Sequence, residues 1–203
     1  MIIFMSDILC VTNRNLCKEE FLQRVEKIAA NHPKGIILRE KDLSEEEYKK
    51  IAEKVLRICE KYHVPCMLHS FVDVALELRA ENIHLPLYIL QELDEKTKEK
   101  FKIIGASCHS VEEAQAAENL GCTYITAGHV FVTDCKKGLA PRGLDFLKNV
   151  IESVSLPVYG IGGIDHKNIH AVRNIGAAGT CIMSGLMKCD DVFDFMKDFE
   201  IKA

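Results

Sequence analysis

The sequence lacks any apolar run close to the ~20 residues that a membrane-spanning helix needs. It also lacks a basic excess, because 26 Lys and Arg residues face 30 Asp and Glu residues and leave a net charge of −4. The first shortage excludes a membrane span, and the second argues against nucleic acid or an anionic membrane surface as the main partner. The apolar opening Met1–Met5 has no basic region before it and Asp7 after it, so we expect no signal peptide.

Cysteine is plentiful, but the patterns that would give it a structural role are missing. The 203 residues contain nine cysteines, an odd number, with no Cys-x-x-Cys pair and no zinc-ligand spacing. Cys66, Cys122 and Cys181 lie inside apolar runs, where a reduced thiol behaves as a small hydrophobe. We therefore expect a cytoplasmic protein, in a compartment that keeps thiols reduced.

Short β-branched segments alternate with amphipathic segments along the whole chain, an order typical of βα units. We count eight such pairs and predict a single-domain (β/α)8 TIM barrel over residues 1–203. An open doubly wound sheet is the alternative, but it usually needs a glycine-rich loop after its first strand, where this chain has Asn13-Arg14-Asn15. The predicted strands are Ile8–Thr12, Gly35–Arg39, Cys66–His69, Ile83–Leu85, Ile103–Ser107, Cys122–Ala127, Val158–Ile161 and Thr180–Met183. The predicted helices are Glu19–Asn31, Ser44–Tyr62, Val72–Arg79, Leu93–Phe101, Ser110–Gly121, Leu144–Ser153, His166–Ile175 and Asp191–Phe199.

Glycines mark the ends of the last two predicted strands, in "YGIGGI" and "CIMSGL". In barrels of this kind the chemistry gathers in the loops after the strands, and a phosphate is often held after strands seven and eight. Gly162, Gly163 and the Ser184-Gly185 pair would let backbone N–H groups approach such an anion. The alternative is that the glycines only make tight turns. Two such ends on neighbouring strands favour a phosphate-bearing ligand.

The segment "GHVFVTDCKKGL" places His129 directly after the sixth predicted strand, beside Thr133, Lys136 and Lys137. An imidazole titrates near pH ~6.5 and can take and return a proton at neutral pH. His129 is therefore a candidate general base, although many histidines only pack against their neighbours.

Two basic residues, Arg39 and Lys41 in "LREK", follow the second strand and are candidates to face an anion. Spacing alone leaves open whether they instead pair with Glu40 or Asp42. His69, His84 and His109 also lie near strand ends, which raises a metal hypothesis. They show no local ligand spacing and no acidic residue among them, so we expect no metal.

The order of "LREK", "GASCHS", "GHVFVTDCKKGLAPRG", "VYGIGGI" and "IMSGL" resembles the thiamine phosphate synthase superfamily over nearly the whole chain. Within it, the sequence is similar to the TenI branch, the thiazole tautomerases. The family's Asn-Asp pair after strand three falls on His69-Ser70, its second aspartate falls near Ile89, and the glutamine before "LR" in many synthases is Ile37. A synthase needs Mg²⁺ held by acidic side chains, and these departures remove them.

The resemblance implies a thiazole tautomerase of thiamine biosynthesis, without a cofactor. Its substrate would be a small-molecule thiazole phosphate, a non-aromatic carboxylate with an exocyclic alkene that isomerises to the aromatic ring. It implies His129 as proton relay and Ser107 and the retained Thr133 as ligand contacts. Gly162-Gly163 and Met183-Ser184 would donate backbone N–H bonds to the phosphate, and Arg39, Lys41 or Lys136 would offset the carboxylate. A thiamine phosphate synthase and a non-catalytic phosphate-ligand-binding regulatory protein remain alternatives. Small barrels often form homodimers, which is the assembly we expect here.

Overall fold

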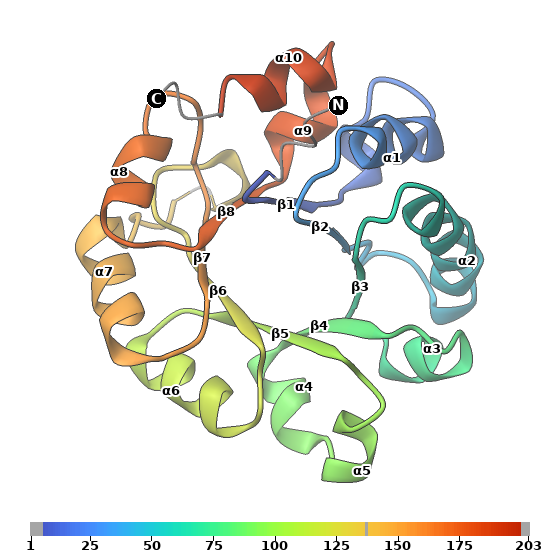
Figure 1. The fold of residues 1–203 in the computed structure, drawn as a ribbon, viewed down its shortest axis with the longest axis horizontal. Coiled ribbons are helices and arrows are strands. Elements are labelled where there is room, and N and C mark those ends of the chain that lie inside the picture. The colour runs from blue at the N-terminus through green and yellow to red at the C-terminus, as the bar shows by residue number, and fades with distance from the viewer. Residues whose placement is uncertain (1–5, 137, 200–203) are drawn as a thin grey trace. The chain divides into compact units, whose positions relative to one another are not determined.

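The computed structural model describes residues 6–136 and 138–199, and within them eight strands close a barrel in chain order (Figure 1). The strands are β1 (Ile8–Val11), β2 (Gly35–Leu38), β3 (Cys66–His69), β4 (Asn82–Pro86), β5 (Ile103–Cys108), β6 (Tyr124–Gly128), β7 (Val158–Ile161) and β8 (Gly179–Ile182). The predicted (β/α)8 barrel is confirmed. Contacts between Cα atoms divide the chain into two compact units, residues up to Ile83 with those from Ile182 onward, and His84–Cys181.

The first unit holds the parallel pairs β1–β2 and β2–β3, whose residues are all buried. Helix α2 covers these strands. It begins at a reciprocal capping box, which Ser44 and Glu47 form. The buried Tyr48 on α2 then donates from its hydroxyl to the Leu38 carbonyl oxygen at 2.7 Å. The helical segments of this unit are η1 (Arg14–Leu16), α1 (Phe21–Ala30), α2 (Glu45–Lys61), α3 (Val72–Glu77), α9 (Ser184–Lys188) and α10 (Val192–Lys197).

The second unit holds the parallel pairs β5–β6, β6–β7 and β7–β8. In the β5–β6 register Gly105 lies beside Tyr124 and Ser107 beside Thr126. Since successive side chains of a strand point to opposite faces of the sheet, these two pairs lie on the same face. The helical segments of this unit are α4 (Leu87–Glu92), α5 (Glu95–Lys98), α6 (Val111–Asn119), η2 (Asp134–Lys136), α7 (Gly143–Ser153) and α8 (Ile169–Asn174).

Three short helices correct the sequence prediction. The predicted helix Leu93–Phe101 is only α5, because Leu93 is extended and Asp94 caps a new helix by accepting the Thr97 N–H at 2.7 Å. The preceding α4 and the later α9 were not predicted. α4 starts directly after Pro86, and α9 begins two residues after β8, where Met183 was assigned to the strand.

No helix in the part of the chain that the structure describes is long and apolar enough to cross a membrane. The eight cysteines whose side chains the structure describes form no disulfide. Burial raises the pKa of the Cys108 and Cys122 thiols to about 12. These side chains therefore stay protonated and pack as small hydrophobes.

Candidate active site

The end of β6 brings His129 against the end of β7, within the second unit. Gly128 closes β6, and the Val130 N–H donates to the Ile161 carbonyl oxygen at 2.9 Å, so pairing continues past the strand. A Cβ on Gly128 would collide with that carbonyl, and one on Gly162 would lie 2.8 Å from the His129 Cα. The two glycines therefore let the His129 backbone lie directly on the end of β7.

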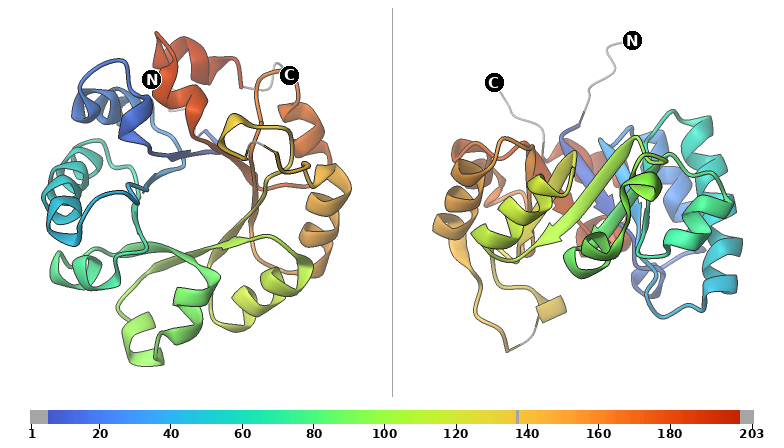
Figure 2. Two further views of the ribbon diagram at one scale, coloured as in Figure 1. Left: turned by 180° about the vertical axis from the view of Figure 1, so that it is seen from behind. Right: turned by 90° about the horizontal axis from the view of Figure 1, so that it is seen from below.

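The loop after His129 is closed at its base by two backbone hydrogen bonds. The Arg142 N–H donates to the His129 oxygen and the Gly143 N–H to the Val130 oxygen, each at 3.0 Å. Figure 2 shows the described parts of this loop, residues 131–136 and 138–141, extending beyond the neighbouring helices of this unit. The His129 side chain is half-buried, and its Nε2 lies 3.4 Å from the Leu139 oxygen on the returning limb. The backbone of this histidine is thus held firmly, while its ring makes one long hydrogen bond within the described part of the chain.

Thr133 and Lys136 lie on the same loop as His129. The Lys136 N–H donates to the Thr133 oxygen at 3.1 Å, closing the turn that contains η2. Thr133 is half-buried and Lys136 is exposed. Lys137 lies outside the described residues.

The glycines at the end of β7 have a steric role of their own. Gly162 and Gly163 have φ values of +98° and +68°, which L side chains rarely adopt. A Cβ on Gly163 would lie 2.8 Å from the Phe131 carbonyl carbon, so the loop after β6 needs both glycines. The tight-turn alternative therefore has direct support, and phosphate binding at these residues stays a prediction.

His109 fixes the other side of the β6 end. Its Nδ1 is 2.9 Å from the Gly128 oxygen, which can only accept, so Nδ1 carries a proton and donates. The His109 backbone N–H donates to the Glu113 carboxylate, and the Ser110 hydroxyl caps α6 by accepting the Glu113 N–H. The peptide before His129 is therefore tied to the start of α6. Sequence reasoning weighed His109 only as a metal ligand and missed this contact.

Ser107 lies at the penultimate position of β5 and is half-buried. Its Oγ is 2.9 Å from Nε2 of the buried His84, whose Nδ1 is 2.8 Å from the Tyr124 hydroxyl. The predicted ligand contact is therefore part of a polar network that the sequence did not indicate.

In the first unit, the end of β2 carries Arg39 and Lys41 on either side of a buried carboxylate. Glu40 accepts from the Thr12 hydroxyl at 2.7 Å and from the Arg14 backbone and side chain. Arg39 donates its backbone N–H to the Thr12 hydroxyl oxygen at 2.9 Å and is half-buried, while Lys41 is exposed.

Arg14 is the cation that binds both Glu40 and Asp42. It binds Asp42 through two hydrogen bonds of 2.6 and 2.7 Å and Glu40 through one of 3.1 Å. These bonds keep the pKa of Asp42 well below its usual range and raise that of Arg14 above its usual range. Both carboxylates that were possible partners for Arg39 and Lys41 are thus bound by Arg14. Arg39 makes no ion pair with another described residue.

The end of β3 carries a bonded pair, His69 and Ser70. The Ser70 Oγ is 2.6 Å from His69 Nδ1, and the Phe71 N–H donates to the His69 oxygen at 2.9 Å across Ser70. Ser70 has a φ of +70°, which makes this a γ-turn of the rare kind. Ile89, the other position that departs from the resemblance, is half-buried on α4.

Ser70 and Ile89 do not fit a hard cation, because neither residue offers a carboxylate. Across residues 6–136 and 138–199, no group of three or more His, Cys, Asp or Glu side chains is placed to hold a metal ion.

Met183 and Ser184 lie where β8 passes into α9, in the first unit. Met183 accepts the Met187 N–H at 3.0 Å, so the chain turns from strand to helix at once. Their donation to a phosphate stays a prediction.

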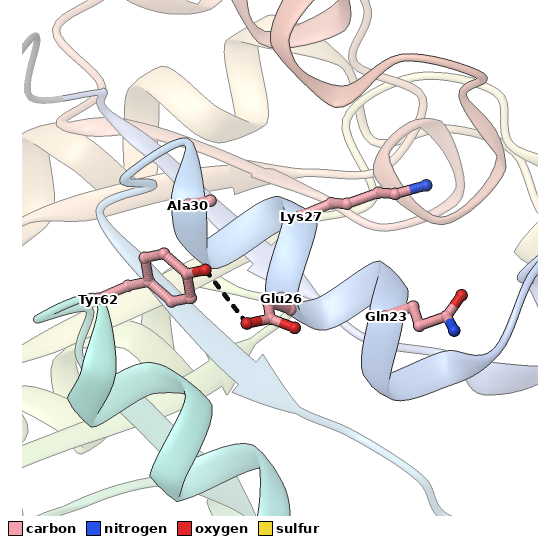
Figure 3. Close-up of a pocket in the computed structure, with 5 residues that line it drawn as sticks. All are labelled: Gln23, Glu26, Lys27, Ala30 and Tyr62. Atoms are coloured by element: carbon pink, nitrogen blue, oxygen red, sulfur yellow. Dashed lines mark hydrogen bonds between the residues drawn. The ribbon is translucent and has the colours of Figure 1, made fainter.

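A surface hollow lies elsewhere, on the outside of the first unit. It is lined by Gln23, Glu26, Lys27, Ala30 and Tyr62 of α1 and the end of α2 (Figure 3). The Tyr62 hydroxyl donates to Glu26 at 3.1 Å. None of the site residues predicted from the sequence lines this hollow.

The fold and the polar residues at the strand ends indicate a class of protein. This class is the β/α barrels that act on small molecules at the carboxyl ends of their strands. The chain belongs to the TMP-TENI family, described as thiamine monophosphate synthase, which matches residues 8–186. It is 35% identical over 190 residues to the thiamine-phosphate synthase of Clostridium acetobutylicum, covering 91% of this chain and 88% of that one. With the thiamine-phosphate synthase of Fusobacterium nucleatum it shares 33% identity, covering 95% and 96%. The solved thiamine phosphate pyrophosphorylase from Pyrococcus furiosus has a TM-score of 0.81 at 30% identity, covering 95% and 92%.

Proposed function

We propose that this protein is a thiazole tautomerase within the thiamine phosphate synthase superfamily. Its substrate is a thiazole carboxylate phosphate with an exocyclic carbon–carbon double bond. One proton leaves the ring carbon beside the carboxylate, and one is added to the exocyclic carbon, so that the ring becomes aromatic. Aromatisation drives the reaction, and the protein needs to relay one proton and hold an anion. We expect it to act in the cytoplasm, as a homodimer.

The placement of His129 is the observation that carries this proposal. Its backbone is fixed on both sides, by the bond from His109 to the preceding carbonyl and by the Arg142 N–H on its own oxygen. Its imidazole is half-buried on a strand-end loop and, among the residues that the structure describes, makes one hydrogen bond, of 3.4 Å. A ring that is anchored through its backbone and lightly bound at Nε2 suits a group that takes up and returns a proton.

The anion-binding part of the proposal uses the remaining predicted residues. Gly162, Gly163, Met183 and Ser184 would hold the phosphate by backbone N–H groups, with Thr133 nearby on the loop. Arg39 supports the proposal best among the cations, since its neighbouring carboxylates are already bound to Arg14. Lys41 and Lys136, both exposed, are the other candidates for the carboxylate.

A thiamine phosphate synthase is the second candidate, because the curated relatives carry that name. That reaction displaces pyrophosphate and calls for Mg²⁺ bound by carboxylates. Ser70, bonded to His69, and the apolar Ile89 stand where the resemblance places those carboxylates. These residue types favour the isomerisation over the displacement. Incubation with thiazole phosphate, pyrimidine pyrophosphate and Mg²⁺ tests the alternative, and thiamine phosphate formed at an enzymatic rate would overturn our ranking.

The tautomerase is tested by following aromatic product with the wild type, His129→Asn and His170→Asn. His170 is an exposed histidine on α8 and serves as the matched control. We expect His129→Asn to lower the turnover rate by about 10²–10⁴-fold, the usual contribution of a general base, and His170→Asn to leave it unchanged. Equal, slow conversion by all three proteins would instead support a non-catalytic phosphate-binding protein.

A further inference from the structure

A chain of three hydrogen-bonding side chains crosses the interior of the second unit. The Tyr124 hydroxyl is 2.8 Å from His84 Nδ1, and His84 Nε2 is 2.9 Å from the Ser107 Oγ. Tyr124 begins β6 and lies beside Gly105, so Ser107 is two residues nearer the carboxyl end of β5. Tyr124 and His84 are 6% and 2% exposed, whereas Ser107 is half-buried. The network therefore runs from the buried interior toward the strand ends.

Gly105 makes room for this network. A Cβ at Gly105 would lie 2.5 Å from His84 Nδ1 and would collide with the Tyr124 ring. The phenol and the imidazole can meet across β5 only because this residue has no side chain. The rings of Tyr159 and Tyr124 pack edge to face, with ring centroids 5.7 Å apart, and this contact keeps the phenol in place.

The direction of the first hydrogen bond follows from the burial of Tyr124. Burial, and then the neighbouring Cys181, Tyr159 and Cys122, raise the pKa of Tyr124 well above its usual value, so the phenol keeps its proton. Among the residues that the structure describes, only His84 offers this hydroxyl an acceptor. A buried hydroxyl proton without an acceptor is costly, so Tyr124 donates and His84 Nδ1 accepts.

The direction of the second bond follows from the first. A neutral imidazole that accepts at Nδ1 carries its proton at Nε2. That N–H donates to the Ser107 oxygen, since Nε2 and Oγ are 2.9 Å apart. The Ser107 oxygen therefore accepts the hydrogen bond from His84. The proton of the Ser107 hydroxyl can then be donated to a group at the strand ends.

We propose that Tyr124 and His84 are positioning residues that hold the Ser107 hydroxyl as a hydrogen-bond donor toward an anionic oxygen of the ligand. The identity of that ligand rests on the proposed function, which supplies both a carboxylate and a phosphate. The arrangement favours groups that accept hydrogen bonds and disfavours an uncharged hydroxyl that must donate one.

The orientation of the network is tested on the free wild-type protein by ¹⁵N NMR of the His84 ring. We expect a protonated Nε2, an unprotonated Nδ1 and a slowly exchanging Tyr124 hydroxyl proton that correlates with Nδ1. In Tyr124→Phe the Nδ1 resonance should move toward that of an unbonded nitrogen. A proton on Nδ1 in the wild type would overturn the proposal.

The role of the network in binding is tested by calorimetry with the aromatic thiazole carboxylate phosphate and, separately, with inorganic phosphate. We expect Ser107→Ala to weaken product binding about tenfold, the size of a hydrogen bond to a charged group. We expect Tyr124→Phe to weaken it a few-fold and to add nothing in the Ser107→Ala background, because it acts through Ser107. Equal weakening of inorganic phosphate binding assigns the contact to the phosphate, and unchanged phosphate binding assigns it to the carboxylate.

Tyr62→Phe is the matched control, since it removes a phenol hydroxyl on the outer surface hollow, and it should leave affinity unchanged. Additive effects of Tyr124→Phe and Ser107→Ala would overturn the positioning role, as would wild-type affinity in Ser107→Ala. A wild type that binds product without converting it contradicts only the proposed function. If it binds neither probe, the donor role of Ser107 fails even when the His84 spectrum is as expected.

Discussion

The two units differ in how fully the polar side chains at their strand ends are hydrogen-bonded. At the ends of β1 and β2, Glu40 is buried and bonded to Thr12 and Arg14, and Asp42 is bound by the same arginine. At the end of β6, the backbone of His129 is held on both sides, while its ring makes one hydrogen bond, of 3.4 Å, to the described residues. The first arrangement binds two carboxylates to one arginine and stabilises the loops, and the second leaves an imidazole with little hydrogen bonding. Proximity to a strand end therefore does not by itself make a residue functional; what matters is whether its polar atoms are already bonded.

The largest expected effect comes from removing the buried carboxylate of Glu40 at the end of β2. Glu40→Gln removes the buried charge that faces Arg14 and should lower the free energy of unfolding by about 3 kcal/mol. Urea unfolding measures it, with the exposed Lys41→Gln as a control that changes stability little. A loss below about 0.5 kcal/mol would show that Glu40 is not the anchor of this region.

The next effect comes from displacing His129 through its backbone. Gly162→Ala must place a Cβ against His129 at a φ of +98°, and should cost about 2–3 kcal/mol of stability and most of the tautomerase activity. Gly176→Ala is the matched control, with a φ of +92° but its nearest contact at 3.8 Å, and should cost about 1 kcal/mol and no activity. Equal losses in the two variants would mean that contact with His129 is unimportant.

A smaller effect is expected from His109, which holds the peptide before His129. His109→Ala should lower the turnover rate about tenfold with little change in KM, because the reacting ring is misplaced rather than removed. His109→Asn keeps a donor near the Nδ1 position and should restore most of the rate. If Asn and Ala behave alike, the bond to Gly128 does not position the site.

The smallest expected effect is on the pH dependence of stability, through the pair of Arg14 and Asp42. Arg14 holds the pKa of Asp42 below its usual range, so this pair stabilises the protein above the unfolded-state pKa of about 4 and loses that contribution as the pH falls further. Asp42→Asn should therefore flatten the acid limb of the stability curve slightly at low salt. An unchanged acid limb would show that this exposed pair contributes nothing measurable.

Much of the fold could be predicted from the sequence because its strands are short, buried and clearly bounded. Val158–Ile161 was predicted with its observed ends, between Pro157 and Gly162. The helix α4 was missed because a proline precedes it and it has only six residues, too few for a helical period to show.

The candidate site was predictable only where it lies within one segment. "GHVFVTDCKKGL" carries His129, Thr133 and Lys136 together, so one motif indicates all three. The partners of Ser107 are different, because His84 is 23 residues away and Tyr124 is 40 residues from His84. Only the register of β5 and β6 and the missing side chain of Gly105 bring them together. The hold of Arg14 on Glu40 also joins distant segments, 26 residues apart.

The central claim is that His129 moves the proton, and NMR in deuterated buffer tests it most directly. The measurement follows deuterium entering the former exocyclic carbon of the thiazole as the alkene substrate becomes aromatic. We predict rapid incorporation with the wild type and His170→Asn, because the half-buried imidazole exchanges the proton it takes up with the solvent before returning one, and incorporation at the rate of buffer alone with His129→Asn. Incorporation by His129→Asn at the wild-type rate would contradict the account.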